Sequence, residues 1–206
     1  MGEIDKWIVS KAKEVFDETH RLFGEYNFVH GMSGLNYFIV NELSGVYIDI
    51  TKDRMYCDAA DSAERRSTQS AMAIIAKSML GLIAPILTYT ADEIFENAPS
   101  VIKGSANDIF DVTYAAIESV ESSWDEATMK VIREKFNEIV DGLKKEKVIK
   151  NTLELVISTT STVAKAMKKA DIEEYLVISK WCACELKDIL GTFEIEGDKF
   201  NIALAS

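Results

Sequence analysis

The first part of the chain carries apolar residues at spacings of three and four, which is the period of an amphipathic helix. The pattern from Ile4 to Tyr26 predicts one helix of about five turns. A second pattern of the same period runs from Phe28 to Tyr47, with Asn27 in a suitable position for an N-cap. We expect these two helices to bury one face each and to pack antiparallel.

A third helix is predicted from Ala71 to Ile83, after a polar stretch from Lys52 to Ser62. It is apolar on two sides, so it is expected to lie centrally in a bundle. Pro85 lacks a backbone donor and disturbs the helical hydrogen bonds, so this helix should kink or end near Ala84.

Two shorter signals follow along the chain. The Thr90–Glu93 spacing resembles a capping box and predicts a short helix that stops before Pro99. Ser100–Ser122 has weak apolar content and is predicted to be loop. The Ser123–Glu126 spacing is a second capping box, which predicts a long helix carrying the apolar residues of Val131–Leu143. The first part of the chain is therefore interpreted as a bundle of about five helices.

The pattern changes at Thr152, where alternating apolar and polar residues predict a strand. We then expect a short helix over Thr162–Asp171, a strand over Tyr175–Cys184 and a hairpin over Phe193–Ala203. A boundary is placed near Asn151. The predicted fold is mainly α, with a helical bundle in residues 1–150 and a small α/β subdomain in residues 151–206.

Composition supports a folded, unexported protein. Hydrophobic residues make up 48% of the 206 residues, which is enough for a core. Neither a membrane-spanning run nor a secretory leader is recognised. The three cysteines, Cys57, Cys182 and Cys184, are too few for a disulfide framework and suit a reducing cytosol, so we expect a cytoplasmic protein in which the last two are buried thiols.

The formal net charge of −11 opposes a general affinity for nucleic acid. The charge is unevenly distributed along the chain, which weakens this argument: the segment from Lys130 to Thr152 has seven basic and four acidic residues. A charged, solvated helix face explains the same segment equally well.

No constellation of catalytic residues stands out. His20 and His30 lie ten apart, which places them on neither one helix face nor a metal-ligand spacing. The Cys182 and Cys184 pair lacks the further ligands of a zinc site. There is no phosphate-binding loop and no Ser, His and acid arrangement. We therefore predict no catalytic and no metal-binding residue.

The most informative feature is a set of charged and aromatic residues between the apolar helices, too rich in such groups for a generic linker. Its members are Asp49, Lys52, Asp53, Arg54, Tyr56, Cys57, Asp58, Asp61, Arg65, Arg66 and Gln69.

Three runs, Tyr47–Asp58, Asp61–Gln69 and Leu82–Phe95, closely resemble the C-terminal helical domain of bacterial-type isoleucyl-tRNA synthetases. Asp5–Trp7 and Tyr26–Phe28 follow the family's order, and later so do Arg133, Asn137, Asp141, Lys144, Lys147, Ile149 and Thr152–Glu154. The Leu82–Phe95 run also resembles related synthetases. The Lys-Asp-Arg-Met-Tyr-Cys-Asp run narrows the resemblance to the synthetases specific for isoleucine. The chain departs from the family at two positions: Lys150 stands where the family usually has glycine, and Thr88 stands where it usually has proline.

The resemblance implies an anticodon-binding fragment without chemistry of its own. The catalytic signatures of the family are absent here, and so is its terminal zinc module. ATP, magnesium and zinc are therefore expected only in a parent protein, and the fragment needs no cofactor. The implied partner is the tRNA for isoleucine, bound by a monomer.

Candidate tRNA contacts are the cations of the interhelical region and of the end of the long helix: Lys52, Arg54, Arg65, Arg66, Lys144, Lys147 and Lys150. Arg54 and Arg66 could equally tie a loop to carboxylates such as Asp49 or Asp53. A protein-interaction module related to a synthetase domain remains the alternative, favoured by the chain's acidity.

Overall fold

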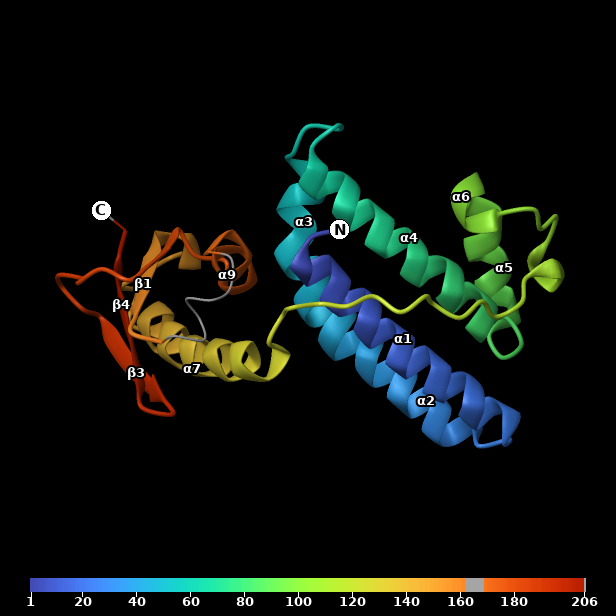
Figure 1. Ribbon diagram of the computed structural model, residues 1–206, viewed down its shortest axis with the longest axis horizontal. Helices are drawn as coiled ribbons and strands as arrows, with labels where there is room; N and C mark the ends of the chain where they lie inside the picture. The colour runs from blue at the N-terminus through green and yellow to red at the C-terminus, as the bar shows by residue number, and fades with distance from the viewer. Residues whose placement is uncertain (162–168, 206) are drawn as a thin grey trace. The chain divides into compact units, whose positions relative to one another are not determined.

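The computed structural model describes residues 1–161 and 169–205. The chain forms two compact units, Met1–Ser122 and Ser123–Ser206. The first is helical and the second combines helices with a four-stranded sheet, as Figure 1 shows. The predicted class, mainly α followed by a small α/β region, is confirmed.

The first unit begins with two long helical segments that pack side by side. Helix α1 spans Glu3–Gly24. After a turn, α2 (Phe28–Tyr37), the π-helical segment η1 (Phe38–Ile48) and α3 (Asp49–Tyr56) follow one another without a break. The predicted antiparallel pair is confirmed. Asn27 is the N-cap residue, but its side chain contacts His30 instead of capping the backbone.

The polar stretch before the third helix is shorter than predicted. Helical structure continues to Tyr56, and α4 (Ala63–Ile83) already begins after Ser62, whose Oγ accepts a hydrogen bond from Arg65 N at 3.1 Å. A connection between the helices is present, but its predicted bounds were too wide because polar residues on the outer side of a helix conceal its continuation, while Thr51 and Thr68 face inward.

After α4 the chain breaks at Pro85 as predicted. Helix α5 (Thr88–Asn97) starts after Leu87 and stops before Pro99, so the capping box assigned to Thr90 was wrong. Short turns α6 (Ser100–Lys103) and η2 (Ile109–Asp111) interrupt the predicted loop.

An extended segment, residues 112–122, returns along α1 and α4 and closes the first unit (Figure 1). Tyr114 Oη donates to Asp17 at 2.7 Å, and Ser78 Oγ donates to the Ala115 carbonyl at 2.7 Å. A Cβ at Gly81 would lie 2.4 Å from the Thr113 carbonyl oxygen, so only glycine permits this approach.

The second unit packs α7 (Glu126–Lys145) against a four-stranded sheet. Its strands are β1 (Leu155–Thr159), β2 (Lys180–Cys182), β3 (Gly191–Ile195) and β4 (Asp198–Leu204), in the order β2-β1-β4-β3. Strand β1 pairs parallel with β2 and antiparallel with β4. Helix α9 (Lys169–Leu176) and the turn η3 (Thr152–Glu154) complete the unit.

The predicted boundary near Asn151 differs from the division after Ser122. The long helix was expected to close the bundle, but α7 contacts β3, and Arg133 Nη1 donates to the Tyr175 carbonyl at 2.9 Å. Its apolar stripe is therefore buried within the second unit. The helix cap is Asp125, which accepts from Thr128 N at 3.1 Å, so the assignment of Ser123 was wrong.

The observed strands agree only in part with those predicted from the sequence. The hairpin is confirmed, and Glu196 and Gly197 form its turn with φ of 52° and 89°. Strand β1 is central in the sheet and buried at all five positions, so its burial does not alternate as it would in a strand with one face exposed to solvent. The predicted strand over Tyr175–Cys184 shrinks to Lys180–Cys182. The predicted helix at 162–171 falls mainly on 162–168, outside the described residues.

The two neighbouring cysteines correct a further expectation. Cys182 and Cys184 form a disulfide, with Cα atoms 5.4 Å apart, and Cys184 is exposed. They are therefore not buried thiols. Strand β2 ends at Cys182, which frees the chain to bend and bring the two sulfurs together. Cys57 is free and exposed. Within the described part of the chain, no helix has both the length and the apolar composition needed to cross a bilayer.

Candidate nucleic-acid interface

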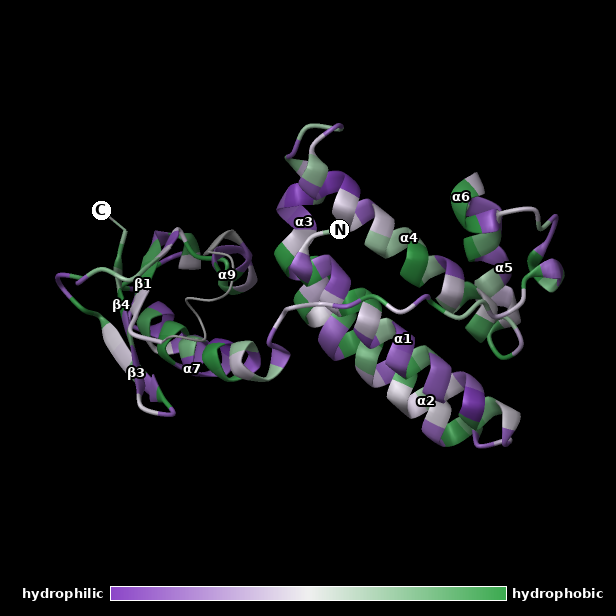
Figure 2. Ribbon diagram, in the orientation of Figure 1, coloured by the Kyte–Doolittle hydropathy of each residue, from purple (hydrophilic) through white to green (hydrophobic). Residues whose placement is uncertain are grey.

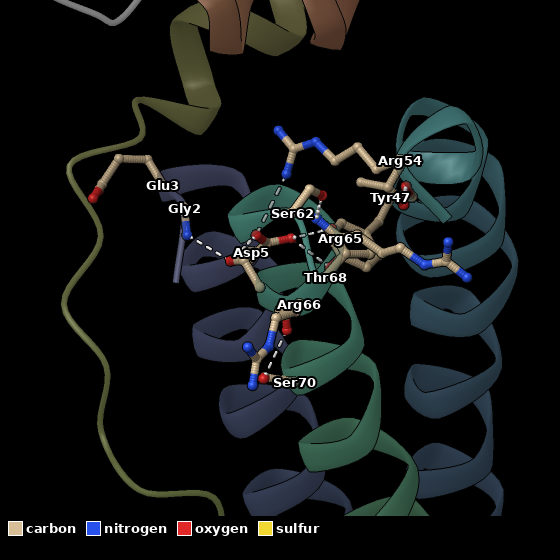
Figure 3. A network of polar contacts seen from close by, with 12 residues as sticks. Gly2, Glu3, Asp5, Tyr47, Arg54, Ser62, Arg65, Arg66, Thr68 and Ser70 are labelled. Carbon is tan, nitrogen blue, oxygen red and sulfur yellow. Dashed lines mark hydrogen bonds and ion pairs between the residues drawn. The ribbon is translucent and has the colours of Figure 1, made fainter. Parts of the chain in front are cut away.

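A buried carboxylate organises the end of the helical unit where four candidate cations lie. Asp5, in the first turn of α1, is fully buried. Its Oδ1 accepts from Tyr47 Oη at 2.6 Å and from Thr68 Oγ1 at 3.2 Å, and Ser67 Oγ donates to Oδ2. Three helical segments, α1, η1 and α4, are thereby joined through one side chain (Figure 3).

Arg54 belongs to this network. Its Nη1 lies 3.4 Å from Asp5 Oδ2, and its side chain is only 13% exposed. Figure 3 shows the guanidinium turned toward Asp5. The interpretation in which Arg54 ties the chain to a carboxylate therefore holds, although the partner is distant Asp5 rather than neighbouring Asp49 or Asp53. Burial and the Asp5 carboxylate raise the pKa of Tyr47 far above its ordinary value, so this tyrosine stays a donor.

Arg65 also makes a hydrogen bond within the protein. Its Nη1 donates to the Asp58 carbonyl at 2.8 Å, across the connection between α3 and α4, and the side chain is half-buried. It therefore stabilises the turn that brings the two helix ends together. Its Nε is buried and has no hydrogen-bond partner among the described residues.

Lys52 and Arg66 are exposed instead. Lys52 Nζ pairs with Asp49 one helical turn earlier at 3.0 Å, and both side chains are about half exposed. An exposed pair of this kind contributes little and can exchange its partner. Across the described residues, the Arg66 guanidinium makes no hydrogen bond or ion pair. The Arg66 backbone carbonyl accepts from Ser70 Oγ at 2.8 Å, and its backbone N–H donates to the Ser62 carbonyl at 3.1 Å.

The other three candidates cluster at the C-terminal end of α7. Lys144, Lys147 and Lys150 are all exposed, and none of them has an ion pair within the described parts of the chain. The helix end is closed by hydrogen bonds from Lys147 N to the Lys144 carbonyl at 3.1 Å and from Val148 N to the Leu143 carbonyl at 2.9 Å.

This cap forces Lys147 into the left-handed region, with φ of 59°. Glycine is the usual residue here because it carries no Cβ penalty, which is about 1–2 kcal/mol for other residues. Lys147 is exposed at this position, so its ammonium group is accessible to solvent.

Exposed aromatic residues were missed as candidates. Tyr56, Tyr89 and Phe110 are each more than four-fifths exposed, and Tyr89 reaches 94%. Tyr56 lies one helical turn after Lys52 and was noticed only as a member of the polar set. Aromatic faces can stack on unpaired bases, so exposure is the signal that singles these residues out, and exposure is not visible in a local sequence pattern.

Comparison with known proteins gives the family. Residues 5–174 match the family described as the anticodon-binding domain of tRNA ligase. The isoleucine–tRNA ligase of Sulfurimonas denitrificans is 58% identical over 206 residues, all of this chain and 22% of that protein. Those of a Nitratiruptor and a Sulfurovum species are 53% and 48% identical over 98% of the chain. The chain spans about a fifth of the length of these relatives. It belongs to the family of anticodon-binding domains of tRNA ligases.

Proposed function

We propose that the chain is the tRNA-binding part of an isoleucine–tRNA ligase, where it positions the tRNA for isoleucine during ATP-dependent aminoacylation. The observation that carries the proposal is the family match over residues 5–174, together with relatives that share the whole chain. Adenylation by ATP and magnesium, and any structural zinc, would belong to regions outside this chain. The ligase would act as a cytoplasmic monomer.

Exposure divides the candidate cations by role. Arg54 contacts buried Asp5 and Arg65 donates to the Asp58 carbonyl, so both would shape the ends of α3 and α4 without touching phosphate. The exposed cations that remain for phosphate contacts are Lys52, Arg66, Lys144, Lys147 and Lys150. Tyr56 would offer an aromatic face beside Lys52 for an unpaired base.

The test uses the full-length ligase that carries this chain. Joint replacement of Lys144, Lys147 and Lys150 by alanine is expected to raise the apparent KM for tRNA, because removing cations that bind phosphate weakens binding whatever the base sequence. Isoleucine-dependent pyrophosphate exchange, which needs no tRNA, should not change. Lys130→Ala with Lys135→Ala is a control, since it removes two exposed charges from α7 away from its C-terminal end.

Unchanged tRNA kinetics in a folded triple variant would reject these lysines as tRNA contacts. The alternative, a protein-interaction module, is favoured only by the net charge of −11. If the 206-residue chain bound no tRNA and the variants left aminoacylation intact, that alternative would replace the proposal.

A further inference from the structure

The run from Asn27 to Ile48 is almost free of charge in a highly charged chain. Charged residues make up 28% of the sequence, yet this run contains only Glu42. The Glu42 side chain is 17% exposed and one of its carboxylate oxygens lies 4.0 Å from Lys11 Nζ on α1. The outer side of α2 and η1 therefore presents no Asp, Glu, Lys or Arg to water, apart from this largely covered carboxylate.

Large apolar side chains stand on that outer side. Val29, Tyr37, Val40 and Ile48 are 79%, 54%, 53% and 43% exposed. Val29, Ser33 and Tyr37 recur every four residues in α2, and Val40, Ser44 and Ile48 recur every four residues in η1, so each group of three lies along one side of its segment; Ser33 and Ser44 are small and exposed. We call the six residues Val29, Ser33, Tyr37, Val40, Ser44 and Ile48 the uncharged face.

Neighbouring α1 shows what a water-facing surface looks like in this protein. Its outer side carries ion pairs one turn apart, including Arg21 with Glu18 and Glu25. Figure 2 shows strongly hydrophilic turns along α1 and paler ones along α2. Single exposed apolar residues are ordinary, whereas a stripe of exposed apolar residues without charge is typical of a surface used for interaction.

The chemistry of the uncharged face selects the kind of partner. It has no cation for phosphate, so it does not suit tRNA. A face about 30 Å long and 10 Å wide buries roughly 300 Å² on each side, or about 600 Å² in total. That is below the roughly 1,200 Å² of a stable complex between separate proteins, but it reaches the range of about 600–1,500 Å² for domains of one chain.

We infer that the uncharged face docks onto an apolar surface in the remainder of the ligase polypeptide. This rests on the proposed function, because the relatives carry about four-fifths of their length outside the matched region. Covalent connection makes so small an interface sufficient, since the docking surfaces are held at high effective concentration. The face would thus fix the tRNA-binding part against the rest of the enzyme.

Hydroxyl-radical footprinting tests the inference without tRNA or substrates. Oxidation of Tyr37 is compared between the 206-residue chain and the full-length ligase, with the highly exposed Tyr89 as the control. In the full-length protein the Tyr37 rate should fall about fivefold, because residues at the centre of an interface are largely shielded from solvent. Tyr89 should keep its rate.

A second readout uses Val40→Glu, which places a charge on the face. We expect the 206-residue chain to keep its stability, because Val40 is exposed, while Tyr37 of the full-length variant becomes oxidisable again. Equal Tyr37 rates in chain and full-length protein would overturn the inference. So would protection that appears only with tRNA, or only at high concentration of the isolated chain, which indicates a second copy. The proposed tRNA function can fail separately, because the comparison of Tyr37 oxidation between the chain and the full-length protein requires no tRNA binding.

Discussion

At the scale of single residues, a family motif and a candidate site residue turn out to be parts of one buried network. Asp5 accepts from Tyr47, Ser67 and Thr68 and faces Arg54, which lies 49 positions away. Buried polar groups need such partners, and the Asp5 carboxylate supplies one to each of these side chains. The resemblance in Asp5–Trp7 and in the run around Arg54 therefore reflects one structural requirement.

Replacing Asp5 by alanine is expected to lower the free energy of unfolding of the first unit by about 3–5 kcal/mol, because a largely buried cation and three hydroxyl groups are deprived of this acceptor. Urea denaturation followed by circular dichroism measures this. Asp49→Ala, which breaks the exposed pair with Lys52, should cost no more than about 0.5 kcal/mol. Equal effects of the two substitutions would contradict the role assigned to Asp5.

The contribution of Asp17 to the stability of the fold is expected to depend on pH. The hydrogen bond from Lys13, and then that from Tyr114, holds the pKa of Asp17 below its ordinary value of 3.8. A lowered pKa stabilises the fold above the ordinary value, and this contribution is lost as pH falls through the lowered one. Asp17→Asn should therefore destabilise the chain near pH 7, and the difference should shrink as the pH falls below 3.8. A difference of constant size would argue against this ion pair; Glu14→Gln, exposed on the same helix, is the control.

At the scale of elements, helix ends decide which side chains are free. The end of α7 leaves the three candidate lysines and Lys145 exposed, and it holds Lys147 at φ of 59°. Similar caps place Tyr26 after α1 and Val177 after α9 in the left-handed region. The chain thus tolerates strain at several helix ends, and at α7 the strained residue carries a positive charge.

Lys147→Gly is expected to raise the free energy of unfolding of the second unit by about 1 kcal/mol, because glycine adopts this conformation without a Cβ penalty. The same substitution should weaken tRNA binding by removing a phosphate-binding group. Lys145→Gly removes an equal charge at the last residue of α7, where the backbone is not left-handed, so it should not raise the stability. Thermal denaturation of both variants shows whether the stability rises or falls. A loss of stability in Lys147→Gly would contradict the strain assigned to Lys147.

At the scale of the whole molecule, the net charge of −11 opposes the approach of tRNA. Screening confines this repulsion to about 8–10 Å near physiological salt, so a local group of cations can still bind phosphate. Binding should therefore be weak and sensitive to salt.

The 206-residue chain should bind the tRNA for isoleucine with a log K that falls linearly with log salt concentration. Replacing Lys144, Lys147 and Lys150 by alanine should reduce that slope by about one unit for each lysine that binds a phosphate, as fluorescence anisotropy at several salt concentrations can show. A slope that the triple variant leaves unchanged would place the phosphate-binding groups elsewhere.

The sequence by itself determined the periodic features: the first helix pair, the break at Pro85 and the hairpin at Glu196–Gly197. Each of these depends on neighbours within a few residues, through helical spacing, a missing donor or turn chemistry. Runs characteristic of the family indicated its identity in the same way. Helix starts at Thr90 and Ser123 were misplaced because several residues can cap a helix, and only the folded backbone selects one.

Tertiary structure alone decided which candidate cations face water. Arg54 and Lys52 lie two positions apart in one polar run, yet one contacts buried Asp5 and the other is exposed. The same holds for α7, whose apolar stripe is equally suited to a bundle or a sheet and packs on the sheet. Local sequence sets the direction of a side chain around its helix, but a partner tens of positions away decides whether that direction is interior or solvent.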